Sequence, residues 1–150
     1  MQLIFWRHAE AVDGMPDMER VLTDKGIKQA ERMADFLRSR IPQDTRILVS
    51  PARRTQQTAE SLSKHFITEP AIAPNANLQS LLKAANWPEG DGCVLIVGHQ
   101  PTLGEAAALL LCNNCTSFSI KKGAVWWFTR HSRDRDNQTR LHLAISPDLL

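Results

Sequence analysis

The chain has no long apolar run. None of its apolar segments reaches the roughly 20 residues that a membrane-spanning helix needs. The first apolar segment is interrupted by Arg7, and it lacks the basic leader and small-residue cleavage site of a secretory signal. We therefore expect a cytoplasmic protein that does not contact a membrane.

Cysteine is also scarce. The chain has three cysteines, an odd number that suits reduced thiols better than a disulfide framework. Cys112 and Cys115 form a C-x-x-C pair, but no second pair of ligands follows at the spacing of a zinc site. The pair closes an apolar run, whereas a redox pair normally opens a helix. We expect reduced cysteines with no redox or metal-binding role, no metal site and no cofactor. A metal-binding or redox role for Cys112 and Cys115 is the less favoured alternative.

Charge of one sign is not in large excess. The net charge is +2 over 150 residues, which is too small to indicate nucleic-acid binding. Hydrophobic residues make up 43% and charged residues 23%, as in ordinary globular proteins. No repeat, low-complexity tract or linker divides the chain. We expect one domain over residues 1–150, acting as a monomer.

Strand patterns alternate with helix patterns along the chain. Alternation of this kind predicts an α/β fold, specifically a three-layer α/β/α sandwich with a mostly parallel central sheet. Two late strands joined by a polar turn at 131–138 predict antiparallel strands at the C-terminal end. The expected strands cover 2–7, 46–50, 93–97, 124–129 and 139–145, and the expected helices cover 24–41 (stopped by Pro42), 51–66, 78–85 and 102–111.

Polar residues follow three of the expected parallel strands at the point where each strand ends. These segments are Arg7-His8, Ser50 to Arg54, and Gly98 to Gln100. Because the carboxyl ends of parallel strands share one edge of the sheet, we expect these segments to meet where α/β folds place their ligands.

The residue types at this edge suit a phosphoryl group. Guanidinium groups match phosphate oxygens in bidentate geometry, and helix N-termini add N–H donors. A neutral imidazole can accept a phosphoryl group. No carboxylate-rich magnesium cage accompanies them. Taken singly, each residue has a plainer interpretation: a lone histidine usually caps or packs, Arg53 is solvated, and Glu10 caps a helix or pairs with a cation.

Four segments resemble the motifs of the histidine phosphatase superfamily, also called phosphoglycerate-mutase-like. They occur in the family's order, over residues 2–101. The segments are Arg7-His8-Ala9 (R-H-G), Leu22 to Ala30 (L-T-x-x-G-x-x-Q-A), Ser50 to Ala59 (S-P-x-x-R-x-x-Q-T-A) and Gly98 to Pro101 (G-H-x-P).

The resemblance implies a role for four residues. His8 would be the nucleophile that becomes phosphorylated and is then hydrolysed by water. Arg7, Arg54 and His99 would bind the phosphoryl group and stabilise the transition state. Ala9 replaces the usual glycine, which fits unless the backbone there needs a positive φ.

One expected residue type is missing. Family members that cleave phosphate esters usually place an acid between the second strand and the second histidine, and residues 75–82 contain neither aspartate nor glutamate. An alkoxide leaving group needs that acid, whereas a phosphorylated imidazole can be protonated on its own ring. The chain also lacks the large insertion that covers the site in mutases.

The missing acid and the open site resemble the small bacterial phosphohistidine phosphatases that act on histidine-containing phosphotransfer proteins. A phosphorylated histidine protein is therefore the expected partner, with phosphate as product. A phosphatase of small esters such as sugar phosphates or nucleotides stays open if Glu10, Asp13 or Glu89 reaches the leaving group. A phosphate-binding regulatory module is the third alternative.

Overall fold

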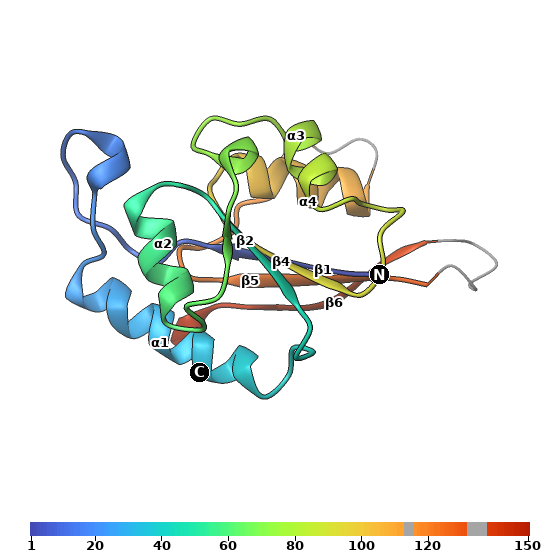
Figure 1. Cartoon of the computed structure of the whole chain (residues 1–150), viewed down its shortest axis with the longest axis horizontal. Coiled ribbons are helices and arrows are strands. Elements are labelled where there is room, and N and C mark those ends of the chain that lie inside the picture. Colours follow the sequence, from blue (N-terminus) through green and yellow to red (C-terminus); the bar gives the residue numbers. More distant parts are fainter. Residues whose placement is uncertain (113–115, 132–137) are drawn as a thin grey trace.

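The computed structural model describes residues 1–112, 116–131 and 138–150, and in these stretches the chain builds one six-stranded mixed sheet (Figure 1). The strand order is β3-β2-β4-β1-β5-β6. The first four of these strands are parallel, and β5 and β6 are antiparallel, as expected. The strands are β1 (Gln2–Arg7), β2 (Arg46–Val49), β3 (Ile67–Thr68), β4 (Cys93–Gly98), β5 (Val125–Arg130) and β6 (Thr139–Ile145).

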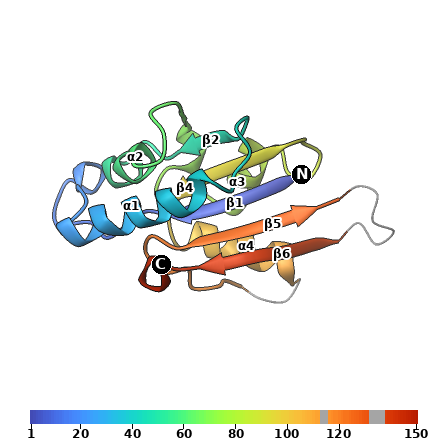
Figure 2. The same ribbon diagram turned by 90° about the horizontal axis from the view of Figure 1, so that it is seen from below.

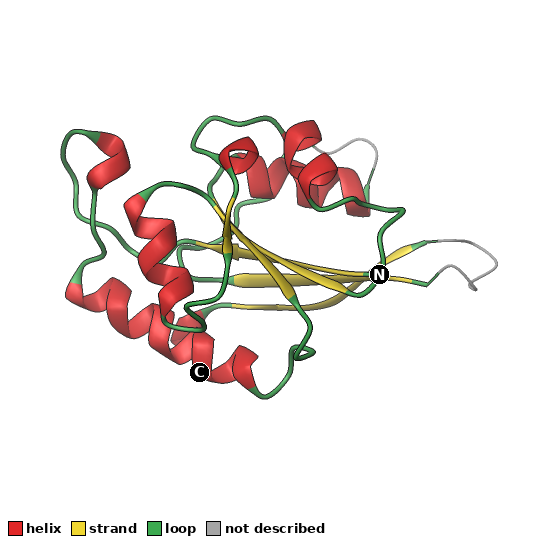
Figure 3. Ribbon diagram, viewed as in Figure 1, coloured by secondary structure: helices red, strands yellow, loops and turns green. Residues whose placement is uncertain are grey.

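Helices cover both faces of the sheet (Figures 1 and 3). Figure 2 shows α1 and α2 on one face, with α3 and α4 behind the strands on the other. The expected α/β/α layering is therefore confirmed. The helices are α1 (Asp24–Arg38), α2 (Arg53–Glu60), α3 (Leu78–Ala84) and α4 (Thr102–Leu111), with short 3₁₀ helices η1 (Asp17–Glu19), η2 (Pro70–Ile72) and η3 (Pro147–Leu149).

The central strand β1 serves both hydrophobic cores. Leu3 and Phe5 pack in the cluster under α3 and α4, while Ile4 and Trp6 pack in the cluster against α1 and α2. Successive side chains of a strand point to opposite faces, so a strand with a core on each side is apolar throughout. This burial holds the end of β1, and the residues that follow it, in a fixed place.

Two helices are shorter than the sequence patterns predicted. The helix expected over 51–66 covers only Arg53–Glu60, and the helix expected to reach Pro42 ends at Arg38. After α2 the Ser63 hydroxyl oxygen accepts the backbone N–H of His65, and such local bonds compete with helical ones. Apolar residues that follow the C-terminal ends of α1 and α2 still pack against the core, although they lie in turns. This explains why the helical spacing of apolar residues continues beyond each helix.

Some predictions fall outside the described residues, namely Cys115 and positions 132–137 of the expected turn. Cys93 and Cys112 are free thiols. In the part of the chain that is described, no helix is both long and apolar enough to cross a bilayer. Within the same ranges, no cluster of three or more histidine, cysteine, aspartate or glutamate side chains has the arrangement of metal ligands.

Candidate active site

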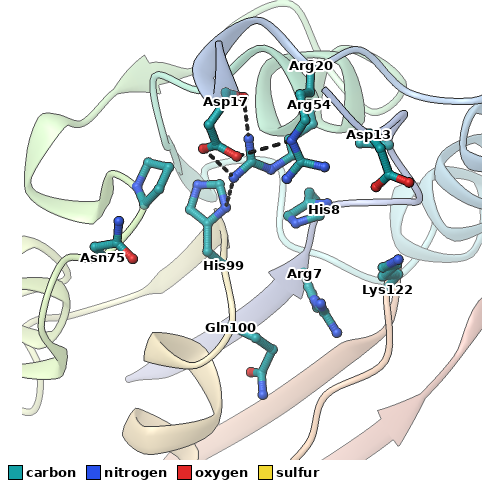
Figure 4. A pocket seen from close by; sticks show the side chains of 12 residues that line it. Arg7, His8, Asp13, Asp17, Arg20, Arg54, Asn75, His99, Gln100 and Lys122 are labelled. Atoms are coloured by element: carbon teal, nitrogen blue, oxygen red, sulfur yellow. Dashed lines mark hydrogen bonds and ion pairs between the residues drawn. The ribbon is translucent and has the colours of Figure 1, made fainter. Parts of the chain in front are cut away.

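A polar pocket lies at the carboxyl ends of β1, β2 and β4, at the sheet edge that the sequence indicated. Its volume is about 330 Å³. Figure 4 shows that Arg7, His8, Arg54 and His99 all reach it, so the structure brings the four sequence-predicted residues together. The other lining residues are Ala11, Asp13, Asp17, Arg20, Pro74, Asn75, Gln100 and Lys122.

His8 is held in one tautomer by the backbone. Its Nδ1 lies 2.8 Å from the carbonyl oxygen of Ala9. A carbonyl can only accept, so Nδ1 carries the hydrogen and Nε2 keeps its lone pair. Ala9 itself is buried and has no positive φ, and its N–H donates to the Thr58 hydroxyl oxygen, so it fits in place of glycine.

Burial, opposed by the Ala9 carbonyl and assisted by the charges of Arg54 and Arg7, lowers the pKa of His8 to about 4. His8 is therefore neutral at pH 7. A neutral imidazole with a free Nε2 lone pair is the form that can attack phosphorus.

His99 is held between a hydroxyl and a guanidinium. Its Nε2 lies 2.7 Å from the Ser50 hydroxyl oxygen, and its Nδ1 lies 3.4 Å from Nη2 of Arg54. Because a guanidinium only donates, Nδ1 is the acceptor, and Nε2–H donates to Ser50. Burial, followed by the proximity of His8 and Arg54, lowers the pKa of His99 to about 3. This ring too is neutral.

The two arginines keep unused donors. Arg7 donates from Nη1 to the carbonyl of Ile120 at 2.7 Å, and Arg54 donates from Nη1 to the carbonyl of Asp17 at 3.0 Å. In each side chain Nε is buried and has no partner. A buried donor without an acceptor costs about 1–3 kcal/mol, more when it is charged. Both arginines thus line the pocket with donors that the described protein groups leave unused.

The loop between β1 and α1 supplies residues that sequence reasoning missed. Asp17 on η1 accepts from Arg20 at 3.1 Å and from Arg54 at 3.3 Å, and Figure 4 shows it above the pocket. Partial burial raises the pKa of Asp17, but the charges and hydrogen bonds of Arg54 and Arg20 outweigh it and hold the pKa below its ordinary value. No periodic pattern marks this loop.

Lys122 and Asn75 are two further lining residues that nothing in the sequence indicated. Lys122 comes from the turn before β5, and Asn75 stands in a left-handed conformation with φ 68°. The pocket wall contains four cationic side chains and two carboxylates. The wall therefore has a positive excess that favours an anionic ligand.

Two carboxylates named from the sequence, Glu10 and Glu89, do not line the pocket, and neither does Glu69. Glu10 accepts from the Thr23 hydroxyl at 3.0 Å and pairs with Lys25 at 3.9 Å. Glu69 caps η2 by accepting the N–H of Ala71. Glu89 is also absent from the lining, whereas Asp13 belongs to it. Asp13 and Asp17 are thus the two acidic residues that line the pocket.

Of the neighbouring arginines, Arg53 lies on the surface and Arg54 is buried. Arg53 pairs at 3.4 Å with Glu60 on the surface, as expected of a solvated side chain. Arg54 is 4% exposed and points into the pocket.

The motif-bearing part of the chain matches one family. Residues 3–79 match the family model of the histidine phosphatase superfamily (branch 1). The chain belongs to this superfamily. It is 31% identical over 119 residues to the phosphohistidine phosphatase SixA of Escherichia coli (strain K12), covering 73% of this chain and 74% of that protein. It is 32% identical over 126 residues to a SixA homolog of Haemophilus influenzae, covering 73% and 77%.

Solved structures share this superfamily fold. The protein histidine phosphatase SixA complexed with tungstate superposes with a TM-score of 0.81 at 27% identity, covering 99% of both chains. A phosphoserine phosphatase of Entamoeba histolytica superposes with a TM-score of 0.73 at 17% identity, covering 97% of this chain and 96% of that one. The latter likeness shows the fold alone.

Proposed function

We propose that the protein is a phosphohistidine phosphatase: it transfers a phosphoryl group from a histidine of another protein to His8 and then to water. One observation carries this proposal. The free Nε2 of a neutral His8 faces a pocket in which Arg7 and Arg54 both keep an unpartnered Nε–H donor.

The first step is a displacement at phosphorus. The Nε2 lone pair of His8 forms the new N–P bond while the N–P bond of the substrate breaks. The electron pair of the broken bond returns to the leaving imidazole, which departs as neutral histidine if its ring was protonated beforehand. Arg7 and Arg54 neutralise the three equatorial oxygens, since phosphoryl transfer needs mainly positioning and charge stabilisation.

The second step returns His8 to its starting form. Water attacks the phosphohistidine, the N–P bond breaks, and its electron pair goes back to Nε2. The proton released by the water goes to solvent or to the phosphate product. The Ala9 carbonyl keeps its bond to Nδ1–H throughout, and it stabilises the extra positive charge that the ring carries while phosphorylated.

The ionisation of Asp17 favours a phosphohistidine substrate. A general acid must hold a proton at the working pH, and Arg54 and Arg20 keep the pKa of Asp17 below its ordinary value. Asp17 is therefore a poor donor to an alkoxide. An imidazole leaving group needs no such donor because it carries its own proton.

The two SixA relatives support the same substrate class, since both are phosphohistidine phosphatases or homologs by name. The SixA structure that superposes on this chain holds tungstate, a tetrahedral oxyanion of phosphate-like shape. In this chain Arg7, Arg54 and His99 would hold such an anion. We propose that the pocket cations supply the charge stabilisation without a metal ion.

A small-ester phosphatase is the second candidate, and Asp13 favours it. This carboxylate lines the pocket and could protonate an alkoxide leaving group. Asp13 is solvent-exposed and belongs to the loop that enters the pocket from above, as Figure 4 shows. On this candidate function, replacing Asp13 by asparagine would impair ester cleavage and leave phosphoimidazole cleavage nearly intact.

The deciding experiment compares a phosphorylated histidine-containing phosphotransfer protein with a panel of sugar and nucleotide monophosphates at equal concentration, in the presence of EDTA. We expect kcat/KM for the phosphohistidine protein to exceed that for every ester by at least about 10²-fold, the range of a missing general acid. Asp13→Asn should not change the phosphohistidine rate. Faster ester turnover that Asp13→Asn abolishes would establish the second candidate instead.

A further inference from the structure

The loop between β1 and α1 has two sides of different character. Asp13, Asp17 and Arg20 line the pocket. Four apolar residues of the same loop are turned to solvent: Met15 is 88% exposed, and Val12, Met18 and Val21 are 38–41% exposed. We call these four residues the apolar rim.

The apolar rim is a local concentration of exposed apolar side chains. Within the described residues it holds four of the ten large apolar side chains that are exposed, although residues 12–21 are a small part of the chain. Single exposed apolar residues are normal, but a group beside a pocket is typical of an interaction surface. Methionine is well suited to such a surface because its flexible thioether adapts to a partner.

The rim is anchored to the fold. The backbone N–H of Val12 donates to the carbonyl of Val21 at 2.8 Å, and Ala11 and Leu22 form an antiparallel bridge. The pairing of Asp17 with Arg54 ties the middle of the loop to the pocket. Figure 1 shows this loop projecting from the end of the molecule at which β1 terminates. The rim therefore lies beside the pocket mouth.

The depth of the pocket indicates which kind of substrate would contact the apolar rim. His8 is only 6% exposed, so the phosphorus must enter the pocket to reach it. A phosphohistidine holds its phosphorus only a few bonds from its own backbone, so the surface of the donor protein must come down on the pocket mouth. A small phosphate ester fits within the 330 Å³ of the pocket and leaves the rim exposed.

We propose that the apolar rim is a docking surface for the substrate protein, specifically for apolar side chains that surround its phosphohistidine. This inference rests on the proposed function and deepens it. The cationic pocket binds the phosphoryl group, and the rim recognises the protein that carries it. Recognition by the rim separates a protein phosphohistidine from the free phosphoamino acid, although the bond that breaks is the same.

The test uses Met15→Gln and the double variant Met15→Gln/Met18→Gln. Glutamine keeps the length of methionine and removes its apolar character. Leu109→Gln is the matched control, because Leu109 is 48% exposed and lies near the C-terminal end of α4. Each variant is assayed on a phosphotransfer protein phosphorylated with phosphoramidate, on free N-phosphohistidine and on p-nitrophenyl phosphate.

We expect the double variant to lose about tenfold in kcat/KM on the phosphoprotein, chiefly through KM, as when apolar contacts are removed from a protein–protein interface. Turnover of the two small substrates should match wild type. Leu109→Gln should match wild type on all three substrates.

Equal rates of wild type and double variant on the phosphoprotein would overturn the proposal that the apolar rim is a docking surface. The proposed function would remain. An equal loss on all three substrates would show that the apolar rim only supports the fold, and this result too would overturn the docking proposal. A change of oligomeric state in the double variant, seen by size-exclusion chromatography, would assign the rim to a second copy of the chain. If the wild type cleaves esters but no phosphohistidine, the proposed function fails, and the rim inference fails with it.

Discussion

The imidazole rings of His8 and His99 lie 5.4 Å apart, centroid to centroid, with their planes at 53°. Each ring is neutral, and each is fixed by one strong hydrogen bond, to the Ala9 carbonyl and the Ser50 hydroxyl respectively. The Nε2 of His8 is the ring atom left for phosphorus, because both nitrogens of His99 already have partners, the Ser50 hydroxyl and Arg54. At this distance a phosphoryl group that His8 attacks lies beside the His99 ring, which can hold one of its oxygens only by turning the Nε2–H away from Ser50.

The buried histidines should make stability depend on pH. Burial lowers the pKa values of His8 and His99 to about 4 and about 3, against 6.5 for an ordinary histidine. The unfolded chain therefore binds protons first as the pH falls. The stabilisation is complete above pH 6.5 and declines below it, by up to about 1.4 kcal/mol per pH unit for each histidine.

Urea denaturation between pH 7 and pH 5 measures this slope before carboxylates begin to titrate. His99→Asn should halve the slope, whereas His65→Asn, at a solvent-exposed position, should leave it unchanged. A slope unaffected by His99→Asn would contradict the burial of a neutral imidazole.

The adjacent arginines provide a matched pair of substitutions. Arg54→Lys should lower kcat/KM about 10²–10³-fold, because a lysine cannot reproduce the planar fork that faces the phosphoryl oxygens. Arg53→Lys should change kcat/KM less than about twofold, since Arg53 only pairs with Glu60 on the surface. Steady-state kinetics on one phosphohistidine substrate compares them; similar losses in both variants would contradict the assignment of Arg54.

Ser50 is expected to act through His99. Its hydroxyl accepts the Nε2–H of His99 and is fully buried, so Ser50→Ala removes the group that orients the ring without leaving a clash. We expect kcat to fall about tenfold or more with KM little changed, and the pH–rate profile to shift as His99 loses its acceptor. Ser61→Ala is the control, because its hydroxyl bonds only to the α2 backbone. An unchanged profile for Ser50→Ala would limit Ser50 to a structural role.

Gly26 permits α1 to approach the loop that follows β1. A methyl group there would overlap the carbonyl oxygen of Glu10, two residues beyond His8. Gly26→Ala should therefore destabilise the protein by about 3 kcal/mol, although alanine in a helix is otherwise better than glycine by about 1 kcal/mol.

The control for Gly26 is Gly98→Ala, where the added methyl meets Leu103 at an ordinary 3.5 Å. We expect this variant to lose less than about 1 kcal/mol in urea denaturation. Equal stability of Gly26→Ala and wild type would mean that α1 is not held against the loop as closely as the structure indicates.

Much of the fold and the centre of the site could be predicted because both depend on local patterns. Continuous apolar runs marked the buried strands, and α1 and α3 begin at Asp24 and Leu78, where helices were expected. The carboxyl ends of parallel strands must share an edge, so His8 and His99 could be placed together without any contact information.

The periphery of the site could not be predicted for a physical reason. Asp17 and Arg20 lie in a loop whose position depends on a contact with Arg54, 37 residues beyond Asp17, and no periodicity encodes such a contact. Residues 75–82 contain no acid, and the pocket takes its carboxylates, Asp13 and Asp17, from the loop before α1; of these two the sequence indicated only Asp13. The ionisation of Asp17 by two arginines could be inferred only from the structure.

The central claim is that His8 carries the phosphoryl group during turnover. Rapid quenching with a ³²P-labelled phosphohistidine protein tests it most directly, with circular dichroism to verify that the His8→Asn variant is folded. We predict a transient, acid-labile and base-stable label on His8 in the wild type, and neither label nor turnover in His8→Asn. Turnover by His8→Asn, or a label on any other residue, would contradict the account.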